Sequence, residues 1–374
     1  MRPVPATEKK VVNPLRALQQ YGQSVWLDYI RRDLLTSGEL KRLIEEDGLR
    51  GMTSNPTIFD KAIGGSADYD GALRAAIAAE PGLSTKALFE RVAMEDIRMA
   101  ADALRPVYDS SGGADGYVSY EVAPDLAYDK DTTIAEAKRL FKTIGKPNVM
   151  IKVPGTAEGV LAIETLIAEG ININETLMFS LSHYEAVAQA YLRGVRRNSQ
   201  PSRIASVASF FVSRVDTVVD AKLEAIGTPE ALALQGKIGI ANCKVVYQRY
   251  KELFTGASFA EFAKRGARVQ RPLWASTGTK NKAYSDVLYV EELIGRDTVN
   301  TLPPATLDAF RDHGRPRASI ESGVEEARAA LASLRKLNVD LEAITKTLQT
   351  QGVASFTESY EQLLRMLEKK RAAI

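Results

Sequence analysis

The sequence predicts an α/β protein, specifically a (β/α)8 barrel with additional helices. Eight short runs rich in β-branched and aromatic residues alternate with longer stretches of helical character. Most consecutive runs begin roughly 30 residues apart, which is the length of one strand, one helix and their loops. The main alternative, a doubly wound open sheet, would favour a glycine-rich phosphate turn after the first strand, and the segment LDYIRRDLL has none.

The expected strands are 25–30, 51–55, 116–122, 148–153, 171–179, 204–211, 271–277 and 298–302. Two intervals, after the second and the sixth strand, are about twice as long as the others. They contain helical stretches at about 85–106 and 215–255, so we expect helical insertions at about 57–115 and 215–270. Because no Pro-, Ser- or Gly-rich linker divides the chain, residues 1–374 are predicted to form a single barrel domain with an N-terminal helix.

Capping signals mark helix starts between the strands. Thr133, Ser182 and Ser322 are each followed three residues later by a glutamate, which is the pattern of a capping box. Thr228 precedes a proline, as at a helix whose first residue is proline. The final segment carries one apolar stripe, so a C-terminal helix is expected to pack on the barrel. The stripe consists of Phe356, Tyr360, Leu363, Leu364 and Leu367.

The composition excludes several classes of function. Forty-nine basic and 47 acidic residues give a net charge of +2, which provides no field for gathering nucleic acid. Cys243 is the single cysteine, so an intramolecular disulfide and a thiolate metal cage are excluded. The two histidines, His183 and His313, are far apart in the sequence, so no metal site is expected.

The N-terminal residues MRPVPATEKKVVNP are polar and interrupted by proline, with no apolar core of signal-peptide length. No later segment has the length and apolar character of a membrane span. We therefore expect a cytoplasmic protein without a membrane partner, either a monomer or a homodimer.

Lys152 is the most informative residue, because it interrupts the apolar run NVMIKV of the fourth expected strand. In such a barrel, catalytic side chains lie at the C-terminal ends of the strands. Burial of a lysine in an apolar interior favours its neutral amine. A neutral amine attacks a ketone and forms a Schiff base, which can accept the electrons of a breaking carbon–carbon bond. The sequence thus predicts Lys152 to be a nucleophile toward a ketone.

Schiff-base chemistry also needs groups that transfer protons. Asp28 and Glu121 lie at the ends of the first and third expected strands and could divide this work, with a water molecule held by Thr176. The same charged residues would also suit a salt-bridged cluster without turnover. Both interpretations place the two carboxylates next to Lys152.

Cations and hydroxyls after the sixth and seventh strands suggest an anion site. Arg214 follows Ser209, and Lys280 follows Ser276. In barrels of this kind, phosphate is often bound near the end of the barrel formed by the last strands. We therefore expect these residues to bind a phosphate group at one rim.

Several ordered motifs give the chain a resemblance to a known family. They are GMTSNPTIF (51–59), VSYEV (118–122), NVMIKVPGTAEG (148–159), ININETLMFS (171–180) and SFFVSRVD (209–216). From about residue 13 to the C-terminus, the sequence resembles transaldolases of the longer bacterial type. The resemblance implies that Lys152 forms the Schiff base, that Asp28 is the acid/base for the C4 hydroxyl of the substrate, and that Glu121 and Thr176 hold the catalytic water.

The resemblance also implies substrate contacts. Asn55, Asn174 and Ser209 match positions that line the dihydroxyacetone unit, and Ser54, beside Asn55, is expected to contribute to the same site. Phe211 matches an aromatic residue near the nucleophile, and Arg214 matches a phosphate ligand. In WASTGTKN, Ser276 and Lys280 follow the seventh strand, where shorter transaldolases have a serine and an arginine for phosphate.

The implied reaction transfers a dihydroxyacetone unit from sedoheptulose 7-phosphate to glyceraldehyde 3-phosphate, giving erythrose 4-phosphate and fructose 6-phosphate. It requires no metal and no organic cofactor. Two alternatives remain at this point. One is a Schiff-base lyase that releases free dihydroxyacetone or cleaves another ketose phosphate. The other is a noncatalytic sugar-phosphate-binding barrel in which Lys152 is only a charge partner.

Overall fold

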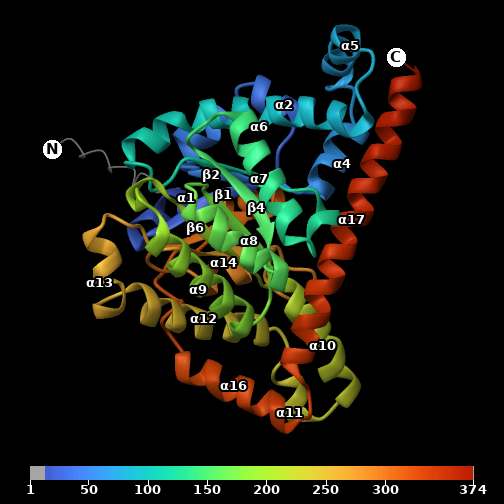
Figure 1. The fold of residues 1–374 in the computed structure, drawn as a ribbon. Helices are drawn as coiled ribbons and strands as arrows, with labels where there is room; N and C mark the ends of the chain where they lie inside the picture. Colours follow the sequence, from blue (N-terminus) through green and yellow to red (C-terminus); the bar gives the residue numbers. More distant parts are fainter. Residues whose placement is uncertain (1–12, 374) are drawn as a thin grey trace, which may run out of the picture.

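The structure, a computed structural model that describes residues 13–373, contains a closed barrel of eight parallel strands (Figure 1). Each strand pairs with the next one along the chain, and the last pairs with the first. This confirms the predicted fold class, and each strand end lies within two residues of its expected position. The strands are β1 Gln23–Asp28, β2 Gly51–Thr53, β3 Tyr117–Glu121, β4 Val149–Pro154, β5 Ile173–Met178, β6 Ser206–Phe211, β7 Arg271–Ala275 and β8 Thr298–Leu302.

Helices surround the barrel and supply the crossovers between its strands (Figure 1). The two long intervals hold several helices each. After β2 these are α4 Pro56–Gly64, α5 Asp70–Ala79 and α6 Thr85–Ser110; after β6 they are α10 Ser213–Ile226, α11 Pro229–Leu232, α12 Ile238–Phe254 and α13 Ala257–Lys264. The other α-helices are α1 Pro14–Ala17, α2 Arg32–Thr36, α3 Glu39–Arg42, α7 Lys130–Ile144, α8 Ala157–Ala168, α9 Leu181–Arg197, α14 Leu288–Glu292, α15 Pro304–His313, α16 Val324–Lys336 and α17 Leu341–Ala373.

Short helical turns complete the connections: η1 Leu18–Tyr21, η2 Leu43–Asp47, η3 Pro124–Leu126 and η4 Pro201–Arg203. The expected N-terminal helix corresponds to the short α1, whose N-cap is Asn13. Residues 1–12, which form most of the polar N-terminal stretch noted in the sequence, lie outside the described residues. Cys243 is buried on α12 and is not in a disulfide.

The three predicted capping boxes are wrong, because each helix begins at a different residue. Asp129 caps α7, since its side chain accepts a hydrogen bond from the amide of Thr132, and Ser180 caps α9 in the same way. These oxygens lie upstream of the predicted caps and satisfy the first free amides, so the helices start earlier. Gly323, in the left-handed region at φ 66°, precedes α16. The prediction of Thr228 as the N-cap of α11 is confirmed.

The C-terminal helix α17 runs along one side of the barrel, next to α4 and α10 (Figure 1). Tyr360, Leu363 and Leu367 are buried, and Leu364 is half-buried. This confirms the predicted apolar stripe. An edge-to-face contact between Phe89 of α6 and Tyr360, with ring centroids 5.9 Å apart, fixes the helix against the insertion that follows β2.

The N-terminal end of the barrel is closed by a buried ionic cluster around Asp115. The Asp115 carboxylate accepts hydrogen bonds from Arg50 Nε at 2.9 Å, Trp26 Nε1 at 2.9 Å and Arg271 at 3.2 Å, and also from the Ser24 hydroxyl. These partners come from β1, β7 and the residue before β2. The cluster thus joins separate strands at the end of the barrel opposite to the predicted site.

Candidate active site

A cavity of about 120 Å³ opens at the C-terminal ends of the strands, and we call it the mouth cavity. Most of the predicted site residues line it, although they are widely separated in the sequence. The predicted residues among its lining are Asp28, Asn55, Lys152, Thr176, Ser209, Phe211, Arg214, Ser276 and Lys280. Three predicted residues, Ser54, Glu121 and Asn174, are not part of this lining.

Lys152 lies inside the barrel with 4% of its surface exposed. Its Nζ donates a hydrogen bond to the Ser54 carbonyl oxygen at 3.0 Å and lies 3.1 Å from Glu121 Oε2. The register of β3 and β4 places Glu121 directly opposite Lys152 on the neighbouring strand. Because side chains at paired positions point to the same face of a sheet, the carboxylate and the amine meet inside the barrel.

Asp28 ends β1 and is held by two threonines. Thr53 Oγ1 donates to Asp28 Oδ1 at 2.7 Å, and the hydroxyls of Thr53 and Thr301 are 2.8 Å apart. Burial raises the pKa of Asp28 above that of an exposed aspartate, and the charge of Lys152 and the hydrogen bond from Thr53 oppose the rise. The carboxyl group can therefore exchange a proton at a higher pH than an exposed aspartate.

Glu121 and Thr176 have polar atoms without partners in the described part of the chain. Glu121 Oε1 and Thr176 Oγ1 are buried, and neither has a hydrogen-bond partner among residues 13–373. Burial raises the pKa of Glu121, while the charge of Lys152 and its hydrogen bond act in the opposite direction. Buried polar atoms without partners are uncommon in proteins, so these two oxygens are suited to binding a small polar molecule.

A set of hydrogen-bonded side chains begins at Asn174, the residue paired with Lys152 on β5. Ser209 Oγ donates to Asn174 Oδ1 at 2.6 Å, and Asn174 Nδ2 donates to Ser119 Oγ at 3.0 Å. Asn174 is fully buried. Ser54 Oγ donates to the Ser119 carbonyl oxygen at 2.7 Å, so this hydroxyl serves the link between β2 and β3 rather than the mouth cavity.

The backbone around Thr176 is irregular. The pairing of β5 with β6 shifts register between Glu175 and Met178, and Leu177 has a φ of 59°. A bulky residue in the left-handed region is strained, and such strain persists only where the surroundings hold it. Gln349 of α17 supplies this support, because its Nε2 donates to the Leu177 carbonyl oxygen at 3.1 Å and to that of Gly155 at 2.9 Å.

The predicted phosphate ligands lie together at one rim of the mouth cavity. Arg214 is in the first turn of α10 and Ser276 directly follows β7, where it has a φ of 56°. The hydroxyls of Ser276 and Ser213 are 2.9 Å apart. Lys280 is exposed but still lines the cavity. The rim therefore presents two cations and the Ser276 hydroxyl, a set that suits an anion, while the Ser213 hydroxyl is buried next to Ser276.

Six cavity-lining residues were missed by the sequence analysis, and three of them have polar or aromatic side chains. Thr53 lies two residues before Asn55, and the two-residue period of β2 could have indicated that its side chain points inward. Thr301 lies on β8, where its side chain also lines the cavity and its hydroxyl contacts that of Thr53. Phe356 was predicted only as the start of the packing stripe of α17, but it also lines the mouth cavity. No local pattern in the sequence indicates that α17 reaches this cavity.

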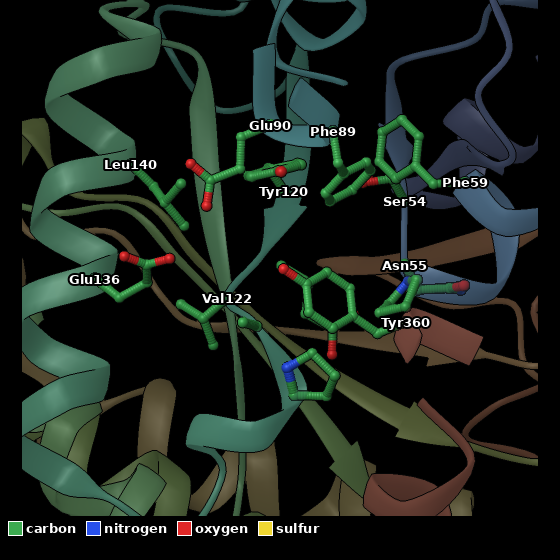
Figure 2. A pocket seen from close by; sticks show the side chains of 14 residues that line it. Ser54, Asn55, Phe59, Phe89, Glu90, Tyr120, Val122, Glu136, Leu140 and Tyr360 are labelled. Carbon is green, nitrogen blue, oxygen red and sulfur yellow. The ribbon is translucent and has the colours of Figure 1, made fainter. Parts of the chain in front are cut away.

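The wall behind Glu121 is a packed aromatic layer. Figure 2 shows the second pocket, on this side of β3, where side chains from α4, α6, α7 and α17 converge. Phe59 is in edge-to-face contact with Phe89 and with Tyr120, at centroid distances of 5.6 and 6.1 Å. Ser54, Asn55 and Glu121 also line this pocket. The helices that follow β2 thus support the strand end that carries Glu121.

Within residues 13–373, no group of three or more histidine, cysteine, aspartate and glutamate side chains is arranged to hold a metal ion. None of the helices in that range has the length and apolar character needed to cross a membrane.

Comparison with known proteins identifies the family. Residues 25–367 match the family described as Transaldolase/Fructose-6-phosphate aldolase. A protein named Transaldolase from Thiobacillus denitrificans is 48% identical over 360 residues, which cover 95% of this chain and 100% of the relative. A Transaldolase from Thermobifida fusca is 47% identical, covering 96% and 99%, and Transaldolase 2 from a Nostoc species is 46% identical, covering 96% and 98%. The chain therefore belongs to the transaldolase/fructose-6-phosphate aldolase family.

Proposed function

We propose that this protein is a transaldolase that transfers a dihydroxyacetone unit from sedoheptulose 7-phosphate to glyceraldehyde 3-phosphate through a Schiff base on Lys152. The products are erythrose 4-phosphate and fructose 6-phosphate. One observation carries the proposal. A buried lysine that lines the mouth cavity lies 3.1 Å from a buried glutamate, and the cavity itself is lined by the carboxylate of Asp28 and has a cationic rim.

The first half of the reaction forms the imine. Once it has given up its proton, Lys152 Nζ attacks the C2 carbonyl carbon of the ketose, and the resulting carbinolamine loses its hydroxyl group as water when it takes up a proton. Glu121 lies 3.1 Å from Nζ and is the nearest group that can receive and return this proton. Its raised pKa favours such exchange, because a buried carboxyl gains a proton more readily than an exposed one. In this proposal Thr176 Oγ1, which has no hydrogen-bond partner among the described residues, orients the departing water.

The second half breaks and remakes a carbon–carbon bond. Asp28 accepts the proton of the C4 hydroxyl, the bond between C3 and C4 breaks, and its electron pair moves into the protonated imine to give an enamine. The aldose product leaves, and the enamine carbon then attacks the aldehyde carbon of the acceptor, whose oxygen takes the proton from Asp28. Water finally hydrolyses the imine and restores Lys152. The proton removed in cleavage is thus returned in the transfer step.

The rim of the mouth cavity explains the preference for phosphorylated sugars in this proposal. Arg214 and Lys280 provide positive charge, and the Ser276 hydroxyl, which lies 2.9 Å from that of Ser213, provides a donor. We assign the dihydroxyacetone end of the substrate to Asn55, Asn174 and Ser209, close to Lys152. In this arrangement the sugar spans the cavity from its polar floor to its rim.

We further propose that residues 1–374 form one domain and that the protein acts in the cytoplasm. The packing of α4, α6 and α17 around the wall behind Glu121 supports the first point, because the insertion after β2 and the C-terminal helix share one aromatic layer with the barrel.

The test is reductive trapping. Incubation with fructose 6-phosphate and sodium borohydride should give a covalent adduct on Lys152, located by peptide mass spectrometry. Lys152→Ala should form no adduct and show no turnover, with an unchanged circular dichroism spectrum. If the wild-type protein turns over the sugar without any adduct on Lys152, the Schiff-base mechanism is wrong.

The family description also includes an aldolase, so the same experiment needs an acceptor control. A transaldolase should consume fructose 6-phosphate only when an aldose acceptor is present. Release of free dihydroxyacetone at the same rate without an acceptor would instead assign the protein as a lyase.

A further inference from the structure

Arg214 is a cation whose surroundings require explanation. It is half-buried in the first turn of α10, and burial lowers its pKa. The negative charges of Asp28 and Glu121 raise the pKa of Arg214, but neither carboxylate accepts a hydrogen bond from it. In the described part of the chain, Arg214 makes no salt bridge with either carboxylate. A partly desolvated guanidinium without a carboxylate partner is costly unless another group holds it.

Two aromatic rings contact the Arg214 guanidinium. Its Cζ lies 5.2 Å from the centroid of Phe211, at the end of β6, and 5.9 Å from that of Phe356, on α17. Both distances are within the range of cation–π attraction. The Phe356 ring also lies 5.9 Å from Lys152 Nζ. One side chain of the C-terminal helix therefore faces both Arg214 and Lys152.

The position of Phe356 is fixed by the helix on which it lies. Gln349, seven residues earlier and on the same face, bonds the carbonyl oxygens of Gly155 and Leu177. Gly352 lies between them, and a Cβ there would come within 2.8 Å of Leu177 Cδ2 and 3.7 Å of an Arg214 nitrogen. The helix thus packs closely against the ends of β4 and β5. Phe356 is buried, with 3% of its surface exposed.

We propose that Phe356 is a specificity-determining residue that holds Arg214 in the orientation needed to bind the substrate phosphate. The rings of Phe211 and Phe356 keep the guanidinium from solvent without neutralising its charge, so its N–H donors stay available to a phosphate. A carboxylate in the place of Phe356 would hold the cation more tightly but would compete with the ligand. Phe356 acts through Arg214, so it is a positioning residue rather than a catalytic one.

This inference rests on the proposed function for the identity of the substrate, but not for the anion site. The first experiment therefore measures binding of inorganic phosphate to the wild-type protein and to the variant Phe356→Leu by isothermal titration calorimetry. Leucine keeps the apolar packing and removes the ring, so the dissociation constant should rise by about fivefold to thirtyfold, the range expected for loss of a desolvated cation–π contact. An equal constant in both proteins, or no phosphate binding by the wild type, would overturn the proposal.

The second experiment compares a phosphorylated with an unphosphorylated donor. Phe356→Leu should raise KM for fructose 6-phosphate several-fold and change kcat/KM for fructose by a smaller factor. Phe356→Tyr keeps the aromatic face, so the ratio of its kcat/KM values for the two donors should equal that of the wild-type protein. A variant that loses activity equally toward both sugars would show that the ring is needed only for packing.

Failure of the proposed function gives a different pattern. If the wild-type protein forms no borohydride adduct with fructose 6-phosphate, the Schiff-base assignment fails, while the phosphate titration still decides the role of Phe356. If Phe356→Leu folds poorly, Phe356→Met supplies a second ring-free side chain for the same titration. Weaker phosphate binding by that variant, with an unchanged circular dichroism spectrum, supports the proposal, and unchanged binding contradicts it.

Discussion

Lys152 shows how neighbours determine the chemistry of a single side chain. Its amine is buried between the Ser54 carbonyl oxygen and Glu121, and Asp28 lines the same cavity. Burial raises the pKa of both carboxyl groups, and the lysine charge opposes the rise in each case. The amine and the two acids therefore form a coupled set in which the loss of one member alters the others.

The first prediction at this scale concerns Glu121. Glu121→Gln should slow the formation of the trapped adduct by about a hundredfold or more, because glutamine cannot transfer the proton of the carbinolamine. Substrate binding should change much less. Single-turnover borohydride trapping measures the rate. The control is Glu136→Gln, which removes a carboxyl group from the pocket behind β3 and should leave the rate unchanged. An adduct that forms at the wild-type rate in Glu121→Gln would remove Glu121 from the mechanism.

The pH dependence follows from the same shifts. Asp28 must be ionised to accept the C4 proton, and its pKa is raised by burial. Activity should therefore fall with decreasing pH at a higher pH than an exposed aspartate, of pKa about 3.9, would give. A profile of kcat/KM against pH measures this acid limb, which reports the free enzyme. An acid limb at or below the ordinary aspartate value would contradict the assignment of Asp28 as the base.

At the scale of elements, strand register decides what meets inside the barrel. Asn174 is paired with Lys152 across β4 and β5, and Glu121 with Lys152 across β3 and β4. The same closed geometry brings Ser24 of β1 and Arg271 of β7 together at the opposite end, around Asp115. Burial alone would raise the pKa of Asp115, but Arg271, Arg50 and its hydrogen bonds together hold it below its ordinary value. The cluster thus stabilises the closed barrel through an ionised carboxylate.

Replacement of Asp115 should destabilise the fold without affecting the site. Asp115→Asn leaves Arg50 and Arg271 without their buried partner, so the free energy of unfolding at pH 7 should fall by about 3–5 kcal/mol. Because the folded-state pKa is depressed, this contribution is present above about pH 3.9 and is lost as the pH falls through the folded value. Urea unfolding at several pH values measures this contribution.

Asp109→Asn, in an exposed pair with Arg105, is the control and should cost less than about 1 kcal/mol. Equal effects of the two changes would show that the cluster does not stabilise the barrel.

For the whole molecule, the C-terminal helix connects distant parts of the chain. Its second half packs on α4 and α6, while in the first half Phe356 lines the mouth cavity and Gln349 bonds the Gly155 carbonyl oxygen. The helix thereby closes one side of the site that the strands build. Residues separated by nearly 200 positions, Gly155 and Gln349, are joined by a hydrogen bond of 2.9 Å.

The contact of Gln349 gives a prediction for this long-range link. Gln349→Leu leaves the carbonyl oxygens of Gly155 and Leu177 without a donor, at a cost of about 1–3 kcal/mol. The loss of these hydrogen bonds should lower the midpoint temperature of unfolding. Because these carbonyls flank the strand ends that carry Lys152 and Thr176, kcat should fall as well. Gln351→Leu, an exposed glutamine on the same helix, is the control and should change neither. A lower midpoint with wild-type kcat would limit Gln349 to a structural role.

Much of the fold and part of the site could be predicted from local pattern. The period of apolar runs indicated the eight strands, and Asp28, Lys152 and Arg214 were found because charged residues at strand ends are unusual. The three capping boxes were wrong, because several polar residues near each helix start can cap it and the local sequence does not rank them. Thr53 and Thr301 were missed because a threonine in a strand is ordinary by composition.

The sequence by itself determined the order of strands and helices, the placement of a lysine in an apolar strand and the amphipathic stripe of the last helix, since these depend on residues close together in the chain. Only the tertiary structure decided that Glu121 faces Lys152, that Ser54 turns to Ser119, that Leu177 adopts a left-handed backbone supported by Gln349, and that Phe356 covers Arg214. The physical reason is that barrel closure and the path of α17 set these contacts. A contact between residues far apart in the chain depends on the packing of the whole molecule, and no local pattern encodes it.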